Sequence, residues 1–527
     1  MNDTPSFSHA AVAAPHRLAA QAGRDILVQG GNAIEAMVAM AATIAVVYPH
    51  MNAIGGDGFW LMREPNGKVR AIEACGFAGE KATRERYRRM EVEAIPSRGP
   101  EAALTVPGSV GGWALALELS AAIGGRLPLN ILLENAAAHA LAGYPVSASE
   151  TRFDPTKDRG LMAAPGFAET YLIDGKPAKA FEVRKVAPFG ETLRHLAHAG
   201  LDDFYRGDIA REIAGDLERI GAPVTRADLK AYRAAWRQPL SLRIHGATLY
   251  NTPPPTQGIA SLILLGLFER LKIRNVESFA YFHGLIEASK RALSIRDFLV
   301  TDFAHLDEDY ADFLTPDALD REVSRIDMAR AASWPLKSDA GDTVWMGAID
   351  AEGRAVSFIQ SIYWEFGSGC VLPRTGVLMQ NRGVSFSLDP AAVNPLQPGR
   401  RPFHTLNPPL CVFDDGRLMS YGVMGGDGQP QFQAQLLTRY RAGQNLCQAL
   451  DAPRYLFGRA WGAPSTSVKL EEGFDDGIGR ALAQAGHEIE WKPRGDLFGH
   501  AGALVRNAKG AIEAAHDPRS DGGAEGV

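Results

Sequence analysis

The chain has 527 residues, of which 46% are hydrophobic and 22% charged, and its formal net charge is -6. This composition is typical of a folded globular protein and excludes a disordered or fibrous one. Neither the net charge nor the mixed charge pattern provides the concentrated positive surface that phosphate binding needs, which argues against a nucleic-acid partner.

The chain shows no sign of export, membrane insertion or metal binding. Its four cysteines form no C-x-x-C pair, which favours a reducing compartment over a disulfide framework or a metal site. The first residues lack the basic and apolar regions of a signal peptide. The strongest apolar runs, 36–47 and 258–268, are shorter than the roughly 20 residues that span a bilayer. We therefore expect a cytoplasmic protein without a membrane partner, and no cofactor motif is found.

The first 150 residues combine helices with a hairpin. Helices are predicted over 17–29 and 33–47, the second capped by Asn32 and apolar nearly all round, so it should be buried. Strands over 59–62 and 69–73 flank a Pro-Asn-Gly turn and predict a hairpin.

The middle of the chain is predicted to be mostly helical. Apolar residues recur at helical spacing over 127–141, 189–199, 209–220, 259–271 and 280–295. The polar segment 334–341 that follows is loop-like and suits a cut in the chain.

From Thr343 onward the pattern changes to strands, which are predicted over 343–349, 355–361, 376–380, 409–413 and 418–423. Helices over 430–441 and 476–486 and a final strand pair complete the chain. Helical blocks around strand-rich blocks indicate stacked sheets covered by helices. By composition alone, Thr343 is an ordinary β-branched strand former.

Seven short motifs, in order, resemble those of the gamma-glutamyltransferase family of N-terminal-nucleophile hydrolases. Each is weak alone, but the ordered set makes the family assignment strong. The motifs are Gly30-Gly31-Asn32-Ala33-Ile34-Glu35-Ala36, Gly55-Gly56-Asp57-Gly58-Phe59, Pro107-Gly108-Ser109-Val110-Gly111-Gly112, Pro253-Pro254-Pro255-Thr256-Gln257-Gly258, Phe366-Gly367-Ser368-Gly369, Gly425-Gly426 and Asp517-Pro518-Arg519.

The resemblance implies an α+β fold, a four-layer αββα sandwich, made as a precursor that cuts itself between Asp342 and Thr343. A large subunit, 1–342, and a small subunit, 343–527, would then stay together. The chemistry is intelligible because cleavage exposes an α-amine with an unperturbed pKa of about 7.7–8.0, which can activate the Thr343 hydroxyl as a nucleophile. Whether two processed chains form a homodimer stays open.

Three further catalytic positions follow from the resemblance. Ser361 matches a second hydroxyl that is hydrogen-bonded to the nucleophile, although a lone strand serine is ordinarily a solvent-exposed one. Gly425 and Gly426 match a backbone pair that forms an oxyanion hole; their ordinary alternative is a turn.

The expected substrate pocket departs from the family pattern. The arginine that holds the carboxylate of a γ-glutamyl group is matched by Cys75, and the acid that holds its amino group is missing from the stretch 380–386. An asparagine is replaced by Tyr363, and a Ser-Ser pair by His404-Thr405. A buried ammonium would lack its partner, which argues against γ-glutamyl transfer.

The altered stretches are similar to the oxamate amidohydrolase branch of the family. We expect Arg382, His404 and Thr405 to bind the carboxylate of a small amide, with Tyr363 and Asn381 beside them. The alternatives are a surface ion pair for Arg382 and a packed core histidine for His404. At the level of function, a γ-glutamyl hydrolase or transferase, a glutaryl-type acylase and an uncleaved binding protein stay open.

Overall fold

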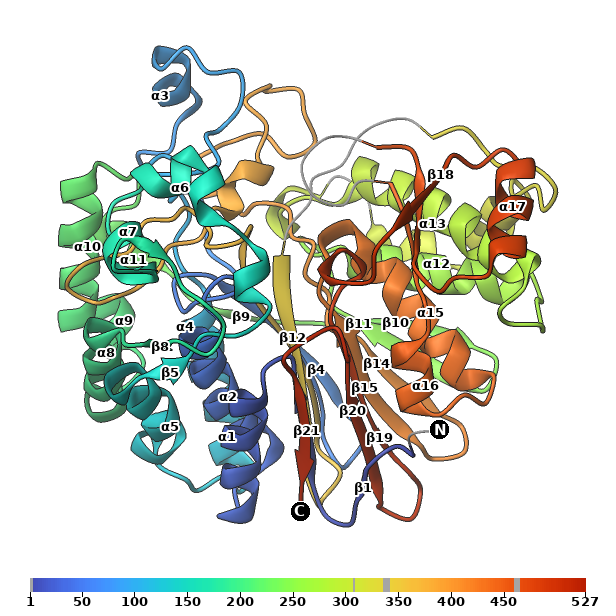
Figure 1. The fold of residues 1–527 in the computed structure, drawn as a ribbon, viewed down its shortest axis with the longest axis horizontal. Helices are drawn as coiled ribbons and strands as arrows, with labels where there is room; N and C mark the ends of the chain where they lie inside the picture. Colours follow the sequence, from blue (N-terminus) through green and yellow to red (C-terminus); the bar gives the residue numbers. More distant parts are fainter. Residues whose placement is uncertain (1–2, 307–308, 335–341, 459–464) are drawn as a thin grey trace.

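The computed structural model describes residues 3–306, 309–334, 342–458 and 465–527. Within them, two seven-stranded antiparallel sheets lie face to face near the centre of the molecule (Figure 1). The first sheet has the order β1 (Ser6–Phe7), β20 (Ile512–His516), β19 (Ala501–Arg506), β15 (Leu418–Val423), β14 (Leu410–Phe413), β11 (Ala247–Asn251) and β10 (Leu240–Ile244). The second has the order β21 (Gly523–Gly526), β2 (Ala11–Ala14), β12 (Asp342–Ile349), β13 (Ala355–Tyr363), β3 (Asp57–Arg63), β4 (Val69–Ala74) and β9 (Ala235–Arg237).

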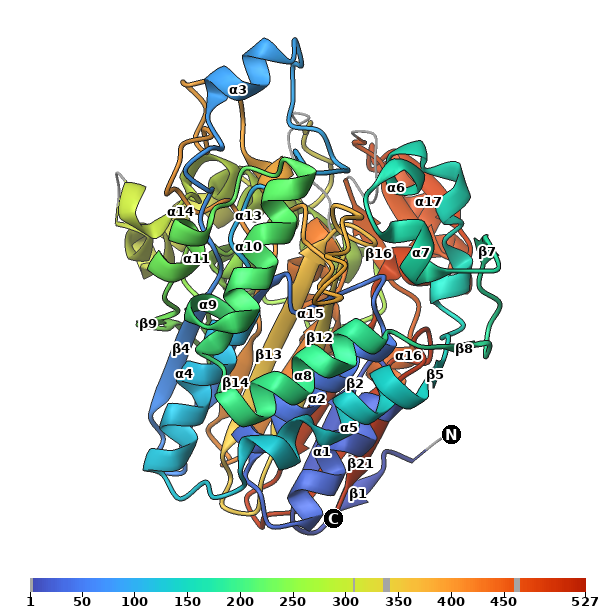
Figure 2. The ribbon, with the colours of Figure 1, turned by 90° about the vertical axis from the view of Figure 1, so that its left-hand side faces the viewer.

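Helices cover the outer face of each sheet, on the left and right sides of Figure 1. The second sheet is covered by α1 (Arg17–Val28), α2 (Ala33–Val47) and α4 (Ser109–Ala122), with α5 (Leu129–Ala142) and α8 (Ala187–Ala199) outside them, as Figure 2 shows. The first sheet is covered by α12 (Gly258–Arg270), α15 (Gln429–Arg441) and α16 (Leu446–Asp451), with α13 (Phe279–Leu299) beside α12.

Separate apolar clusters fill the spaces between these layers. One joins the second sheet to its helices and one joins the first sheet to its helices. A third, which includes Phe59, Trp345 and Leu504, lies between the two sheets. The predicted αββα sandwich is therefore confirmed, and the burial of apolar side chains on both faces of each sheet stabilises it.

The remaining elements are short and lie around this sandwich. The small sheets are β16 (Tyr455–Phe457), β17 (Val468–Glu471) and β18 (Ile489–Lys492); β5 (Tyr144–Pro145) with β8 (Val183–Arg184); and β6 (Leu172–Ile173) with β7 (Lys176–Pro177). The other helices are α3 (Arg84–Arg89), α6 (Arg159–Ala163), α7 (Phe167–Tyr171), α9 (Asp203–Arg206), α10 (Asp208–Ile220), α11 (Arg226–Ala231), α14 (Pro316–Val323) and α17 (Asp476–Gln484). Among the described helices, none is both long enough and apolar enough to cross a membrane.

Helix α2 has the burial that its sequence predicts. All its residues are buried, and its first turn is closed by a capping box between Asn32 and Glu35. The other Glu35 oxygen accepts from the N–H groups of Arg126 and Leu127 at 2.7 and 2.8 Å. One carboxylate thus satisfies donors at the ends of two elements, which lets an apolar helix begin inside the protein.

One expectation about strands was wrong. Residues 376–380 form isolated bridges rather than a strand, because Leu378 and Met379 pair singly with Val371 and Gly55 across a folded loop. The middle of the chain is mostly helical, as predicted, and β10 and β11 from this region add the edge of the first sheet. The predicted loop 334–341 lies outside the described residues except for Trp334.

Candidate active site

Thr343 is the second residue of β12, which forms a hairpin with β13. Strand β12 begins at the upper end of the sheets in Figure 1. The strand register shifts between Asp342 and Val344, beside the expected cleavage point. Thr343 is fully buried, and its Oγ1 donates to Ser361 Oγ at 3.3 Å. The structure thus brings together the two hydroxyls expected to act together.

Two donor groups converge on the Ser361 hydroxyl, one from the end of its own strand and one from a different element. The Tyr363 N–H donates to Ser361 Oγ at 2.9 Å, and an Arg382 guanidinium nitrogen lies 3.5 Å from the same oxygen. Arg382 opens η5 (Arg382–Ser385) and is 1% exposed. A buried cation beside the two hydroxyls gives the site a positive end suited to an anionic group.

Tyr363 supports this arginine from a strained backbone position. Its φ is 85°, in the left-handed region that few side chains other than glycine adopt, and the Arg382 guanidinium carbon lies 4.0 Å from its ring centroid. Such conformations cost about 1–3 kcal/mol and concentrate at functional sites. The cation–π contact holds Arg382 against Ser361.

Asn381 supports the loop around the site through both ends of its amide. Its Nδ2 donates to Ser97 O at 2.9 Å and its Oδ1 accepts from Trp364 N at 3.1 Å. Direct contact between Asn381 and a substrate stays a prediction.

His404 and Thr405 are fully buried. His404 Nε2 lies 3.6 Å from Asp57 Oδ2, and its ring packs edge-on to Phe59. Burial, followed by the charges of Arg382 and Arg401, lowers the pKa of His404 well below its usual value. Its imidazole is therefore neutral in the empty site.

Asp57 is a site residue that the sequence analysis did not single out. It pairs with Ser361 in the β3–β13 register, and its Oδ1 accepts from Gly76 N at 3.0 Å. Burial raises the pKa of Asp57 to about 7, against the opposing effect of the Gly76 hydrogen bond and the Arg382 charge. The signal was the lone acid inside Gly55-Gly56-Asp57-Gly58, at the first residue of a strand.

Gly425 and Gly426 follow β15 and have φ values of 123° and 51°. Gly426 O accepts from Gln257 Nε2 at 2.8 Å, and the same amide donates to Thr405 O at 2.6 Å. Gln257 Oε1 in turn accepts from Arg296 at 2.7 Å, and Arg296 is ion-paired with Asp427. Gln257, whose role the sequence analysis also missed, thus ties the glycine turn to the His404-Thr405 segment.

Cys75 is buried next to the site, and an arginine from a different part of the chain lies near it. Burial, and then the charge of Glu73, raises the pKa of the Cys75 thiol well above its usual value, while Arg401 opposes the rise. Arg401 Nε lies 2.9 Å from a Glu73 oxygen. The positive charge near Cys75 is therefore already partnered by an acid.

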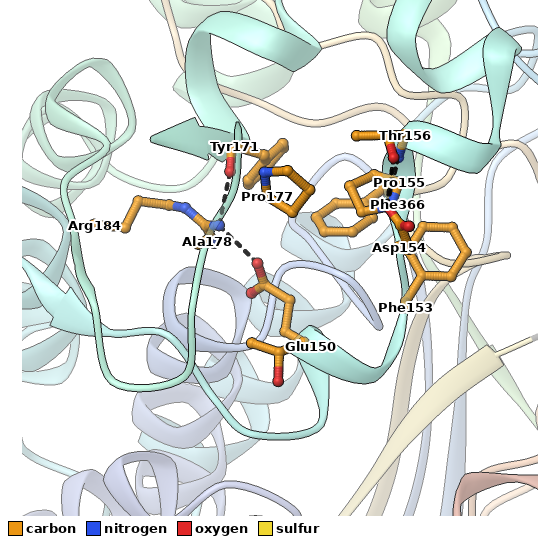
Figure 3. A pocket seen from close by; sticks show the side chains of 11 residues that line it. Glu150, Phe153, Asp154, Pro155, Thr156, Tyr171, Pro177, Ala178, Arg184 and Phe366 are labelled. Carbon is orange, nitrogen blue, oxygen red and sulfur yellow. Dashed lines mark hydrogen bonds and ion pairs between the residues drawn. The ribbon is translucent and has the colours of Figure 1, made fainter. Parts of the chain in front are cut away.

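A separate pocket of about 320 Å³ is lined in part by Phe366, from the loop that follows β13 (Figure 3). Phe153, Tyr171 and Phe366 line it, and the buried Arg184 pairs with Glu150 at 2.7 Å. No residue singled out for catalysis lines this pocket, so it is not the candidate active site.

Among the described residues, one group has the spacing of metal ligands: His283, Glu287 and His487. His283 Nδ1 and His487 Nε2 lie 2.9 Å apart, and the Lys290 ammonium donates to Glu287 at 2.7 Å. The Lys290 ammonium therefore already supplies a positive charge to this group of residues. The group lies outside the site around Thr343.

Comparisons with known proteins point to one family. The family model described as Gamma-glutamyltranspeptidase matches residues 19–527. The chain is 49% identical to the oxamate amidohydrolase proenzyme of Klebsiella pneumoniae, with 100% of both chains covered. It is 38% identical to the glutathione hydrolase-like YwrD proenzyme of Bacillus subtilis, again over 100% of both. A solved cephalosporin acylase from Bacillus halodurans superposes with a TM-score of 0.91 at 32% identity, covering 100% of this chain and 97% of the other.

The chain therefore belongs to the gamma-glutamyltranspeptidase family. It is an amidohydrolase of the N-terminal-nucleophile class, as the sequence motifs predicted.

Proposed function

We propose that this chain is a self-processing hydrolase of small acidic amides such as oxamate, with Thr343 as its nucleophile. The observation that carries the proposal is the buried triplet of Thr343, Ser361 and Arg382, in which one serine oxygen lies 3.3 Å from the nucleophile and 3.5 Å from the guanidinium. The 49% identity to an oxamate amidohydrolase proenzyme supports the same substrate class.

In the proposed precursor, the Thr343 hydroxyl attacks the Asp342 carbonyl, and water opens the resulting ester. Cleavage gives a large subunit, 1–342, and a small subunit, 343–527, whose first residue is Thr343. The register shift between Asp342 and Val344 supports this step, because it places a strand irregularity at the peptide bond that the step breaks.

In the mature enzyme, the α-amine of Thr343 takes the hydroxyl proton while the oxygen bonds to the amide carbon. The Gly425 and Gly426 N–H groups stabilise the negative charge that develops on the carbonyl oxygen. The C–N bond then breaks, the proton passes to the departing nitrogen, and ammonia leaves. Water hydrolyses the ester and restores Thr343.

Substrate recognition in this proposal is by the carboxylate. Arg382, His404 and Thr405 surround it, and Tyr363 holds Arg382 in place. The γ-glutamyl alternative is disfavoured because the ammonium of that group would need an acid near Ser385, whose Oγ instead donates to Phe403 O at 3.1 Å. A glutaryl-type acylase is the second alternative, and the structural similarity to a cephalosporin acylase supports it.

The compartment and the assembly also belong to the proposal. The four cysteines are free, which fits the cytoplasm that the composition predicts. A homodimer of processed chains stays a prediction.

The test compares the release of ammonia from oxamate with the hydrolysis of γ-glutamyl-anilide by the purified enzyme. We expect Arg382→Ala to raise the KM for oxamate by roughly tenfold to a hundredfold, because a hydrogen bond to a charged group contributes about 1.5–3 kcal/mol. Arg88→Ala, at an exposed site in α3, is the matched control and should leave KM unchanged. Hydrolysis of the anilide without hydrolysis of oxamate would overturn the substrate assignment.

Ser385→Asp provides the converse test, because it introduces an acid where a γ-glutamyl ammonium would need one. We expect weaker binding of a small acid by like-charge repulsion and better binding of the γ-glutamyl group. An oxamate KM that does not change in this variant would place the carboxylate elsewhere.

A further inference from the structure

Several buried polar atoms around Ser361 have no hydrogen-bond partner among the described residues. They are Asp57 Oδ2, both ring nitrogens of His404, Thr405 Oγ1 and Gln380 Oε1. All four side chains are fully buried, and such unsatisfied groups are rare in native proteins because each costs about 1–3 kcal/mol. Asp57 lies beside His404 and interacts with Gln380, so these groups indicate that a small polar ligand completes the site.

The orientation of Asp57 in the cluster is fixed by the chain around it. Gly76 N donates to Oδ1, and a Cβ on Gly108 would lie 2.8 Å from the same oxygen, so both glycines pack tightly against the carboxylate. Oδ2 is left to face His404 Nε2 at 3.6 Å. The two groups therefore form one buried acid–base pair next to Ser361.

The charge of the site depends on whether this pair holds a proton. Burial raises the pKa of Asp57 to about 7 and keeps His404 neutral. An ionised Asp57 adds a negative charge beside Arg382, whereas a protonated pair does not. The other titratable or charged groups that face the pair are Arg382, Arg401, Tyr205, Tyr232 and Cys75.

We propose that Asp57 and His404 form a proton-holding pair that recognises the substrate's carboxylate, and that the empty site takes up a proton when this anion binds. Asp57 is then a specificity-determining residue for acidic amides. The inference rests on the proposed function, because it assumes that an anionic acyl group lies beside Arg382.

The pH dependence follows from linkage. A bound anion favours the protonated pair, so the pKa of the pair is higher in the complex than in the empty enzyme. Between those two pKa values the affinity falls as pH rises, by up to about tenfold per pH unit. Below both values the affinity is constant.

The variant Asp57→Asn distinguishes the effect of a hydrogen-bond donor at this position from the effect of a negative charge. In this variant the side-chain carbonyl keeps the Gly76 N–H bond, and the NH₂ group faces His404 in the place of Oδ2. It presents a hydrogen-bond donor and no charge at every pH, as the protonated acid does. The variant should therefore bind a small anion at pH 9 nearly as tightly as the wild type does at pH 6.

The experiment is calorimetric titration of processed enzyme with pyruvate. Like oxamate, pyruvate is a monoanion with a carbonyl next to its carboxylate, but it has a methyl group in place of the amide nitrogen. We expect wild type to take up as much as one proton per anion near pH 8, measured in buffers with different ionisation enthalpies. Asp57→Asn should take up fewer protons per anion, because the Asp57–His404 pair no longer contributes. Any proton taken up by the Thr343 α-amine contributes equally in both proteins. Asp414→Asn, in an exposed pair with Arg243, is the control and should match wild type.

The outcomes separate the two proposals. Binding without proton uptake in wild type, or an unchanged uptake in Asp57→Asn, overturns this inference and leaves oxamate hydrolysis standing. The wild-type measurement does not depend on how the variant folds. Absence of both pyruvate binding and oxamate hydrolysis overturns the proposed function, and this inference with it.

Discussion

Gly425 shows at the scale of one residue why the glycine turn resists substitution. Its φ of 123° strains any other residue, and an added Cβ would lie 3.0 Å from the Phe432 ring. We expect Gly425→Ala to lower kcat by about 10²–10³, because displaced N–H donors act mainly on charge that develops in the transition state. Steady-state kinetics with oxamate measure this, and Gly443→Ala, also at positive φ but with open space around it, is the control. A change in KM alone would mean that the turn only shapes the pocket.

The residues recovered from the sequence are those whose motifs have a fixed spacing in the chain. Thr343 and Ser361 were placed by their match to the family's motifs, and the register of the hairpin that carries them accounts for their contact. Asp57 and Gln257 were missed because their roles arise from tertiary contacts with His404 and Gly426, far along the chain. A buried acid at a strand end has no periodic signature of its own.

At the scale of elements, the junction around α2 is predicted to be a sensitive point for stability. Glu35 accepts from three backbone N–H groups, those of Asn32, Arg126 and Leu127. We expect Glu35→Ala to lower the free energy of unfolding by several kcal/mol, since each orphaned donor costs about 1–3 kcal/mol. Denaturant unfolding measures this. Glu134→Ala, exposed in α5, should change it little, and an equal loss in both variants would contradict the argument.

The type of an element was predictable wherever one hydrophobic period ran without interruption. Helix α15 and strand β15 were predicted to within one residue of their ends, because apolar spacing and turn residues mark them. The 376–380 segment was misassigned, because a short apolar run can form either a strand or, as here, a loop with isolated bridges. Local propensity does not reveal which partner a short segment will find.

At the scale of the whole molecule, the fold explains why a cut chain would stay together. Each sheet contains strands from both proposed subunits. In the second sheet, β12 and β13 of the small subunit lie between β2 and β3 of the large one, and in the first sheet β14 of the small subunit lies next to β11 of the large one. Separation would break strand pairs in both sheets and expose three apolar clusters to water. We therefore expect the two fragments to co-purify without denaturant.

The most direct test of the central claim is the intact mass of the purified protein under denaturing conditions. For the 56.7 kDa wild-type chain, we predict two species of roughly 37 and 20 kDa, with Thr343 as the N-terminal residue of the smaller one. Thr343→Ala should give one full-length species, while Arg382→Ala should still be cleaved. A wild-type protein that hydrolyses oxamate as a single uncut chain would contradict the assignment of Thr343 as the nucleophile.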